Sequence, residues 1–444
     1  MNLSKHFSGL VARVVVTIPP FLLFLVMTSS TLFGSEIINA QSLGITRKVN
    51  NSYFGMHIRW GASTTPWPYT PVYSWRVITE ETAWEGLEPR KGEWHFEKLD
   101  QAISKAEMHG AEVLLTLGYP APWAATDPEM ARKNMGDAQC PRDMEDWRNY
   151  IQTLVRRYKG RIKFYELMNE PLFTETDGNS SHKRYFPVAR MIEMASVAKN
   201  EIMKIDQVAK IVSMSPDGEI NGIKRIDAFL KAGGGKFIDI VGFHYYARTA
   251  EDIPSLVAET RKVMQRYGLE NMPLWNTESG FFIFDPQTPA RKLTPQESPA
   301  YDMVQGSAMV SRALILGAAA GLDRFYYYSW DIPTMSLTSN RGAAVNDAGL
   351  AYITTVRWLR GATIEGCQSD DSKLWKCTLI RPGRKAILLW NTTGTISTKL
   401  PNEWNAIGYE NLKGIYNALT NKQELNVGIS PVLVRSERLL WSSN

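Results

Sequence analysis

Two glutamates in this chain have the surroundings that acid–base and nucleophilic chemistry requires. Glu170 lies in an Asn-Glu-Pro sequence directly after a short run of bulky residues, and Glu278 ends a second such run later in the chain. Paired carboxyl groups cleave glycosidic bonds when one protonates the leaving oxygen and the other attacks the anomeric carbon. A retaining reaction requires the two groups to stand about 5–5.5 Å apart. We therefore predict sugar hydrolysis, with Glu170 as acid/base and Glu278 as nucleophile.

The elements that must position this pair are an alternation of strands and helices. Apolar runs typical of strands buried on both faces occur at residues 53–58, 73–78, 112–117, 163–168, 209–214, 239–245, 272–276 and 324–329. Segments with helical periodicity lie between most of them, at residues 96–109, 144–158, 187–205, 222–231, 253–267, 300–320 and 349–360. The first unit is an exception, because a loop rich in Gly and Pro follows its strand. The repetition predicts a (β/α)8 TIM barrel, in which the carboxyl ends of the strands carry the active site.

The pattern changes after residue 360, where helical periodicity disappears. Short strand-like runs separated by turns follow at residues 374–380, 386–390, 394–400 and 431–435. These runs predict a smaller C-terminal β-sandwich beside the barrel. Cys367 and Cys377 flank a polar turn and would be able to pair in an oxidising compartment, but the sequence leaves their pairing open.

The N-terminus has the composition of a targeting or anchoring segment. Lys5, His6 and Arg13 precede the uncharged residues 14–35, whose centre is strongly apolar. This order is typical of a cleaved signal peptide and of an uncleaved membrane anchor, and both stay open. Either one predicts an exported catalytic domain, anchored at the periplasmic face of the inner membrane, free in the periplasm, or secreted. We expect three parts: a targeting segment, the catalytic barrel and an accessory β-sandwich, at residues 1–40, 41–360 and 361–444.

Composition excludes several classes of function. The chain has 444 residues, 44% hydrophobic and 21% charged, which is ordinary for a folded protein with one large and one small domain. The net charge of +5 is small and forms no basic run, so we expect no nucleic-acid partner. Three scattered Cys and six scattered His predict no metal site, and no cofactor is expected. A polyanionic glycan stays open as a substrate.

The sequences around both glutamates resemble those of the clan A glycoside hydrolases. Residues 166–171, Glu-Leu-Met-Asn-Glu-Pro, are similar to the strand-4 motif of that clan, in which the glutamate is the acid/base. Residues 275–280, Trp-Asn-Thr-Glu-Ser-Gly, are similar to its strand-7 motif, which carries the nucleophile. Residues 84–100 resemble the segment that joins its second strand to its second helix. The resemblance covers about residues 50–360 and implies a TIM barrel with a retaining, double-displacement mechanism.

The resemblance also implies roles for five further residues. Asn169 precedes the acid/base and would bind substrate, and Arg76 would face the nucleophile from strand 2. The His244-x-Tyr246 sequence is similar to a strand-6 motif whose tyrosine hydrogen-bonds the nucleophile. Trp330, after strand 8, matches the tryptophan that forms the floor of the sugar subsite next to the cleaved bond. The alternatives are core packing for His244, Tyr246 and Trp330, and a structural ion pair for Arg76.

Within the clan, the barrel-plus-sandwich layout is most similar to family 39. The N-terminal segment narrows the resemblance to the bacterial members associated with exopolysaccharide and biofilm matrix, which are endo-acting. A polysaccharide or oligosaccharide substrate is implied, together with membrane association through residues 1–40 and an exopolysaccharide biosynthesis complex as partner. Two alternatives are an exo-acting, xylosidase-like β-glycosidase and a non-hydrolytic glycan-binding subunit of an exopolysaccharide assembly complex. Loss of a carboxylate would favour the latter, and both carboxylates are present.

Overall fold

The computed structural model describes residues 43–133, 139–177, 185–284, 300–420, 424–436 and 441. The predicted signal or anchor, residues 1–40, lies outside the described residues. Among the residues described, no helix combines the length and apolar character that a bilayer span requires. The segment Ala40–Asn444 is one compact unit.

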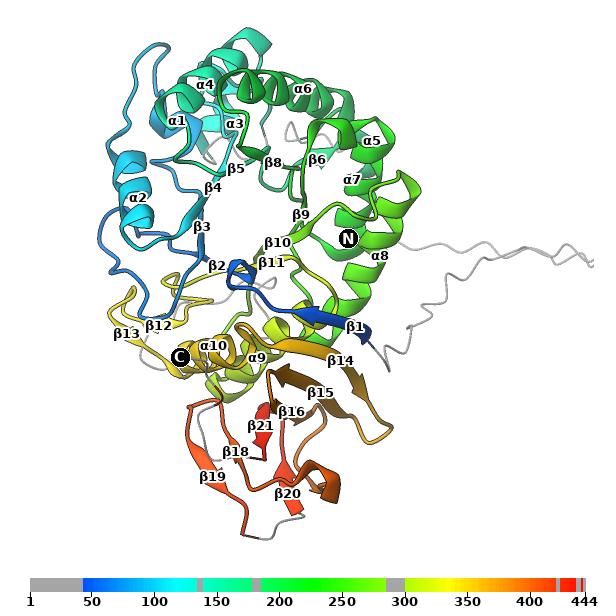
Figure 1. The fold of residues 1–444 in the computed structure, drawn as a ribbon. Helices are drawn as coiled ribbons and strands as arrows, with labels where there is room; N and C mark the ends of the chain where they lie inside the picture. The colour runs from blue at the N-terminus through cyan, green and yellow to red at the C-terminus, as the bar shows by residue number, and fades with distance from the viewer. Residues whose placement is uncertain are drawn as a thin grey trace, which may run out of the picture. The chain divides into compact units, whose positions relative to one another are not determined.

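Eight parallel strands surround a common axis, with helices outside them (Figure 1). In sheet order they are β8 (Lys210–Val212), β5 (Phe164–Glu166), β4 (Glu112–Thr116), β3 (Ser74–Val77), β2 (Phe54–His57), β11 (Arg324–Tyr327), β10 (Leu274–Ser279) and β9 (Val241–Phe243). A parallel bridge between Val212 of β8 and Ile240, just before β9, joins the two ends of this sheet. Each strand overlaps one of the predicted runs, so the predicted (β/α)8 barrel is confirmed.

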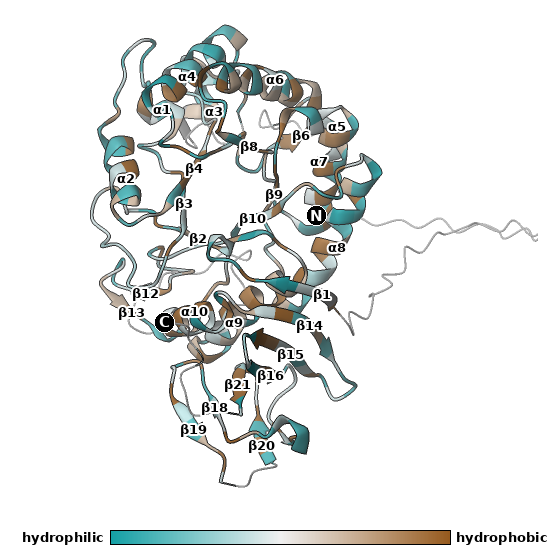
Figure 2. Cartoon of the chain, in the orientation of Figure 1, coloured by the Kyte–Doolittle hydropathy of each residue, from teal (hydrophilic) through white to brown (hydrophobic). Residues whose placement is uncertain are grey.

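Most of the outer helices are amphipathic, as their sequences predict, and Figure 2 shows hydrophilic and hydrophobic residues mixed along them. The long ones are α2 (Glu97–Met108), α4 (Met144–Arg157), α6 (Val188–Ile205), α7 (Glu219–Lys231), α8 (Ile253–Arg266), α9 (Met303–Ala319) and α10 (Asp347–Leu359). In α4, Trp147, Ile151 and Leu154 are buried, and the Asp143 carboxylate accepts a hydrogen bond from the backbone N–H of Glu145. An apolar stripe and a capped first turn are what hold such a helix against a sheet.

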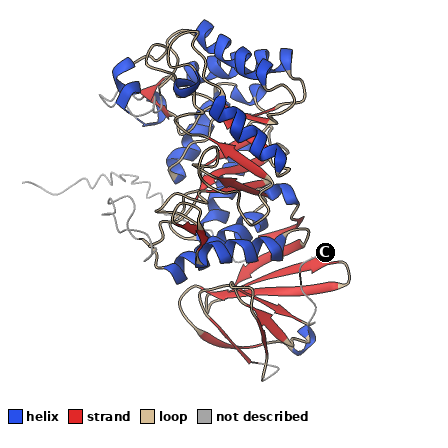
Figure 3. Ribbon diagram, turned by 90° about the vertical axis from the view of Figure 1, so that its left-hand side faces the viewer, coloured by secondary structure: helices blue, strands red, loops and turns tan. Residues whose placement is uncertain are grey.

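The C-terminal residues form two antiparallel layers, and their strands form a group apart from the barrel strands (Figure 3). The larger sheet has the order β1 (Leu43–Lys48), β14 (Thr363–Ser369), β15 (Leu374–Arg381), β16 (Arg384–Asn391), β21 (Val432–Arg435), β18 (Gly408–Glu410) and β19 (Tyr416–Ala418). The smaller layer pairs β17 (Ile396–Lys399) with β20 (Glu424–Val427). Ile387 and Leu389 of β16 share a core with Leu425 and Val427 of β20, whereas Leu388 faces the barrel core. This alternation is that of a β-sandwich, and the predicted sandwich is confirmed.

The first described strand belongs to the C-terminal sheet. β1 lies within the range predicted for the barrel, yet it pairs antiparallel with β14, with Lys48 opposite Thr363. Within the described residues, the chain therefore passes from the accessory sheet into the barrel at β2. Nothing in the local sequence of β1 reveals this, because its only ladder partner lies at the other end of the chain.

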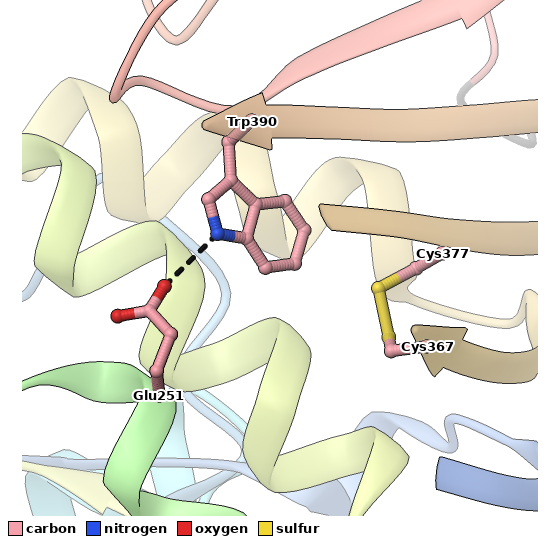
Figure 4. Close-up of a disulfide and its surroundings, with 4 residues drawn as sticks. All are labelled: Glu251, Cys367, Cys377 and Trp390. Carbon is pink, nitrogen blue, oxygen red and sulfur yellow. Dashed lines mark hydrogen bonds between the residues drawn. A yellow bond between two sulfur atoms is a disulfide. The ribbon is translucent and has the colours of Figure 1, made fainter. Parts of the chain in front are cut away.

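The disulfide and a buried hydrogen bond lie where the C-terminal sheet meets the barrel (Figure 4). Cys367 of β14 and Cys377 of β15 occupy paired positions and form the disulfide that the sequence left open. The indole Nε1 of Trp390 donates to Oε1 of Glu251 at 2.9 Å. Glu251 belongs to the short helix η3 (Ala250–Asp252), which leads into α8. A barrel loop and the accessory sheet thus share buried polar contacts as well as apolar ones.

Candidate active site

The two glutamates meet at the carboxyl ends of the barrel strands. Asn169 and Glu170 follow β5, Glu278 is the penultimate residue of β10, and Arg76 lies near the end of β3. All four line one cavity of about 300 Å³. Parallel strands present their carboxyl ends to the same rim of a barrel, so residues far apart in sequence converge there.

The separation of the two carboxylates is the central measurement of the site. One carboxylate oxygen of Glu170, one of Glu278 and Nδ1 of His244 all lie within 4.8 Å of one another. This spacing is close to the roughly 5–5.5 Å of retaining glycosidases and shorter than the roughly 6.5–9.5 Å that leaves room for water in inverting ones. The geometry suits attack by one glutamate and proton transfer by the other.

An irregularity in β10 directs Glu278 toward the cavity. The register between β10 and β11 shifts between Asn276 and Ser279, which is the signature of a bulge beside the nucleophile position. Gly280 follows, and a Cβ on it would stand 1.8 Å from the Tyr328 carbonyl oxygen. Only glycine permits this approach of the two strand ends, which accounts for the Glu-x-Gly spacing.

Glu278 is held by two donors from different strands. Arg76 donates from Nη1 to Oε2 at 2.7 Å, and the Tyr246 hydroxyl donates to Oε1 at 2.8 Å. Burial raises the pKa of Glu278, while the charge of Arg76 and the Tyr246 hydrogen bond oppose that rise. Burial and the neighbouring Glu278 charge raise the pKa of Tyr246, so it stays a hydrogen-bond donor. Two fixed donors orient the carboxylate and favour its ionised form.

Arg76 has four polar partners, one of which is His57, whose Nε2 lies 3.5 Å from Nη1 of Arg76. The Nε of Arg76 donates to Glu166 at 2.8 Å and its Nη2 donates to Asn169 Oδ1 at 2.7 Å, in addition to the bond to Glu278. Although burial opposes it, the charges of Glu166 and Glu278 raise the pKa of Arg76. Glu166 is fully buried and also accepts from the hydroxyls of Thr116 and Ser215. The sequence analysis gave Glu166 no role, although an acidic residue inside an apolar strand is a visible signal.

The backbone and the imidazole of a neighbour fix Glu170. Its φ of 43° lies in the left-handed region, which is unfavourable for a residue with a Cβ. The hydrogen bond from its N–H to the Ser215 carbonyl, at 2.9 Å, retains that conformation. His244 Nδ1 lies 2.7 Å from Glu170 Oε1, and burial lowers the pKa of His244, so the imidazole is neutral. A neutral imidazole accepts or donates according to its tautomer, and it thereby supports both protonation states of an acid/base.

Trp330 lies in the core, which is the alternative to the subsite floor that the resemblance implies. Its side chain is only 1% exposed, packs in the barrel core and does not line the cavity. β11 ends at Tyr327, three residues before Trp330. The backbone N–H of Trp330 then donates to the His57 carbonyl at 2.9 Å, and this bond fixes the backbone at Trp330. Tyr328 lines the cavity instead. Tyr328 belongs to the predicted strand-like run at residues 324–329, which gave no sign that its last residues turn toward the cavity.

Three other polar residues of the cavity were missed by sequence reasoning: His57, Arg59 and Tyr119. His57 ends β2, and its Nε2 lies 3.0 Å from the Thr277 carbonyl oxygen. Burial and the nearby Arg76 charge lower the pKa of His57, so it too is neutral. The only available signal was position, because each residue lies at or just after the end of a barrel strand.

Glu170, His244 and Glu278 also present atoms of the kinds that bind metal ions, and these atoms lie close together. The guanidinium of Arg76 already occupies one side of this group, at 2.7 Å from Glu278. Its positive charge disfavours a cation at the same place. The arrangement is therefore better suited to proton transfer and nucleophilic attack than to metal binding.

Comparison with known proteins points to sugar hydrolases. Residues 72–186, which include β3 and Glu170, match the model of glycosyl hydrolase family 10. A family 39 glycoside hydrolase from Bacteroides cellulosilyticus is similar in structure, with a TM-score of 0.62 and 18% identity over 82% of this chain and 76% of that one. A family 30 endoxylanase from Clostridium papyrosolvens has a TM-score of 0.58 and 14% identity, over 88% and 97% of the two chains.

A family 39 β-xylosidase from Caulobacter crescentus is about as similar in structure as the family 30 endoxylanase. Its TM-score is 0.57 at 13% identity, over 88% of this chain and 98% of that one. At such identities the structural similarity establishes a shared barrel-and-sandwich fold. The match over residues 72–186 adds a relation in sequence, within the part of the barrel that carries Arg76, Asn169 and Glu170.

Proposed function

We propose, from the premise that this chain is a glycoside hydrolase of clan A, that it cleaves internal bonds of a bacterial exopolysaccharide with retention of configuration. The observation that carries the mechanism is the closeness of Glu170 and Glu278, because one carboxylate oxygen of each lies within 4.8 Å of the other. One group acts as acid and base, the other as nucleophile, and both face one cavity.

In the first half of the reaction, the Glu278 carboxylate attacks the anomeric carbon while Glu170 protonates the departing oxygen. The bond from carbon to the leaving oxygen breaks, and a covalent glycosyl–Glu278 ester forms. Arg76 and Tyr246 hold the attacking carboxylate in place through the hydrogen bonds at 2.7 and 2.8 Å. The negative charge of Glu278, near Glu170, favours the protonated form of the acid before attack.

In the second half, Glu170 acts as base. It takes a proton from water, whose oxygen attacks the anomeric carbon and releases Glu278 as a carboxylate. Two inversions at the same carbon give net retention. Glu170 loses a proton in the first half and gains one in the second. His244 stays in contact with it in both states, through Nδ1 at 2.7 Å from Glu170 Oε1.

The substrate class is supported by composition and by the fold. The apolar N-terminal segment favours export, anchored at the periplasmic face of the inner membrane or free in the periplasm or outside, where exopolysaccharide is assembled or released. One similar structure is named an endoxylanase, which favours attack within a polymer. Another is named a β-xylosidase, which keeps exo action as the alternative. The proposal includes association of this protein with a complex that synthesises exopolysaccharide.

Replacement of the nucleophile tests the mechanism. Glu278→Ala should lower turnover of aryl glycosides by about 10⁴-fold or more, because no covalent intermediate forms. Added azide should restore turnover and give a glycosyl azide of inverted configuration, which nuclear magnetic resonance identifies. Full activity in this variant would exclude Glu278 as nucleophile, and Glu278→Gln is the matched isosteric variant.

Replacement of the acid gives a different signature. Glu170→Ala should slow substrates with poor leaving groups far more than activated aryl glycosides, because only the former need protonation. An equal loss on both would contradict the role of Glu170.

The sizes of the products distinguish endo from exo cleavage. A ladder of oligosaccharides indicates endo action, whereas monosaccharides alone indicate exo action. Binding of polysaccharide without any turnover would favour the non-hydrolytic alternative.

A further inference from the structure

Arg59 is a cation in the catalytic cavity that the mechanism does not use. Arg76 and Arg59 both line this cavity. The donors of Arg76 are committed to Glu166, Asn169 and Glu278. The guanidinium of Arg59 instead pairs with Glu80. Among the described residues, Arg59 is thus the cavity arginine that is not engaged by the catalytic carboxylates.

The pair between Arg59 and Glu80 is suited to exchange. The side chains are 27% and 49% exposed, and ion pairs at such positions contribute little to stability. Arginine presents a planar set of donors that binds a carboxylate through two parallel hydrogen bonds. A carboxylate on a bound sugar would be able to take the place that Glu80 occupies, with little loss to the protein.

Asp331 fixes the loop that carries Arg59. Its carboxylate accepts from the backbone N–H of Arg59 at 2.8 Å and of Trp60 at 3.0 Å, and from the Thr65 hydroxyl at 2.7 Å. Asp331 is fully buried, directly after Trp330. A buried carboxylate with three donors from one loop holds that loop in one conformation. Arg59 is therefore presented to the cavity by a preorganised segment.

The same loop carries an aromatic ring beside Arg59. Trp60 is half-buried, and the guanidinium of Arg341 lies 5.0 Å from its ring centre. Aromatic faces pack against the apolar faces of sugar rings, and arginine adds positive charge at the edge of such a platform. Of these residues, Arg59 is the one that lines the cavity with Glu170 and Glu278, while Trp60 and Arg341 lie together beside it.

We propose that Arg59 is a specificity-determining residue that binds the carboxylate of an acidic sugar next to the cleaved bond, and that Asp331 is its positioning residue. The inference rests on the proposed function of the cavity and adds the substrate class, an acidic polysaccharide that contains uronic acid. An acidic sugar beside Glu278 requires a compensating cation, and Arg59 supplies it.

Polymers that differ only in charge give the direct test. Xanthan, gellan and glucuronoxylan, each with its carboxyl-reduced form, keep the same linkages with and without uronate. Wild type should show about tenfold higher kcat/KM on at least one native polymer than on its reduced form, and Arg59→Gln should remove that preference. Glu80→Gln should lower KM on the native polymer, because the competing carboxylate is gone. Arg156→Gln, on the exposed side of α4, is the charge-matched control and should change neither value.

Three results would overturn the inference: equal cleavage of native and reduced polymers by wild type, cleavage of neutral polymers alone, or an equal loss on both forms in Arg59→Gln. Binding is measured separately by affinity electrophoresis of Glu170→Gln in gels that contain the same polymers. The inference is supported if Glu170→Gln is retarded by a native polymer and not by its reduced form, and if adding Arg59→Gln to this variant abolishes the retardation. This holds even where wild type shows no turnover. In that case the proposed hydrolysis fails while the acidic subsite stands; equal retardation in both gels refutes the subsite.

The role of Asp331 has its own signature. Asp331→Asn keeps the size of the side chain but replaces one acceptor oxygen by a donor, so part of the loop is released. KM on the native polymer should rise by about the factor seen in Arg59→Gln, with kcat on the reduced polymer unchanged within about twofold. A merely structural role would instead lower kcat on both polymers, and that result would remove Asp331 from the proposal.

Discussion

At the scale of single residues, the site is built from charges that balance one another at one cavity. Arg76 lies between Glu166 and Glu278, and its bonds to both keep three buried charged groups compatible. Removal of one member of such a set leaves the others unpaired, which costs several kcal/mol. A loss of activity in Arg76→Ala would therefore have two causes that the assay does not separate, a less stable fold and a lost catalytic contact. Substitutions that remove one hydrogen bond and no charge give clearer answers.

Tyr246→Phe is such a substitution. Its hydroxyl donates to Glu278 and opposes the rise in the pKa of Glu278 that burial causes. Without that donor the pKa of Glu278 rises further, so the acidic limb of the kcat/KM profile should move to higher pH. The activity at its optimum should fall by about 10- to 100-fold. An unshifted acidic limb would mean that Tyr246 does not control the ionisation of Glu278.

Glu85, outside the cavity, links pH to stability. Burial and the neighbouring Glu80 raise the pKa of Glu85 from 4.5 to about 7. The folded state thus retains a proton that the unfolded state loses between these two values, so stability falls as pH rises from 4.5 through 7. Glu85→Gln should remove this loss and gain about 1 kcal/mol at pH 8, after a discount for solvent screening, with no gain at pH 4.5. Urea unfolding at both pH values measures it, and an equal gain at both would refute the linkage.

At the scale of elements, irregular positions place the functional groups and regular ones support them. The shift in register near the end of β10 directs Glu278 into the cavity, and Gly280 allows β10 and β11 to approach closely beyond it. The regular ladder from β14 to β16 carries no such group. It supplies the paired positions at which Cys367 and Cys377 bond.

The disulfide should contribute to stability and leave activity unchanged. Cys367 and Cys377 are separated by 10 positions, and a cross-link of this span restricts the unfolded chain by about 2–3 kcal/mol. The double replacement of Cys367 and Cys377 by Ser should lower the free energy of unfolding by about that amount. Reductant should lower the stability of wild type to the same level and leave the variant as it was. A response of the variant to reductant would point to Cys140 instead, which is buried and unpaired.

At the scale of the whole molecule, the barrel and the accessory sheet are joined at both ends of the described chain. β1 precedes the barrel and forms an edge of the C-terminal sheet, while Arg47 within it pairs with Asp323 of the barrel at 2.7 Å. Arg312 of α9 donates to the Ile429 carbonyl in the accessory layer at 2.9 Å. The accessory sheet is therefore part of the support of the barrel.

Two N-terminal deletions that differ by ten residues test this view. Deletion of residues 1–40 leaves β1 intact and should give a soluble, active enzyme. Deletion of residues 1–50 removes β1 and exposes the edge of β14, so the protein should lose stability and aggregate, because an unpaired edge strand recruits other chains. Light scattering and thermal unfolding compare the two. Equal behaviour would mean that β1 contributes nothing, and an insoluble product of the shorter deletion would mean that the N-terminal segment belongs to the fold.

Much of the fold was predictable because its signals are local. Strands of a barrel are buried on both faces and read as apolar runs, and amphipathic helices between them repeat with a different period. The sandwich was predictable in kind but not in detail, since β14, β18 and β19 lie outside the predicted strand-like runs. β1 escaped prediction because its pairing with β14 depends on residues at the far end of the chain.

The sequence by itself determined the barrel, the sandwich and the expectation that Glu170 and Glu278 act together. The reason is that the period of a strand and the position of its end can be recognised from residues that are neighbours in the sequence. The tertiary structure alone decided which side chains share the cavity. It brought Glu166, His57 and Arg59 to the site and turned Trp330 into the core in favour of Tyr328. Such choices depend on the register of parallel strands and on bonds across the barrel, which no local pattern encodes.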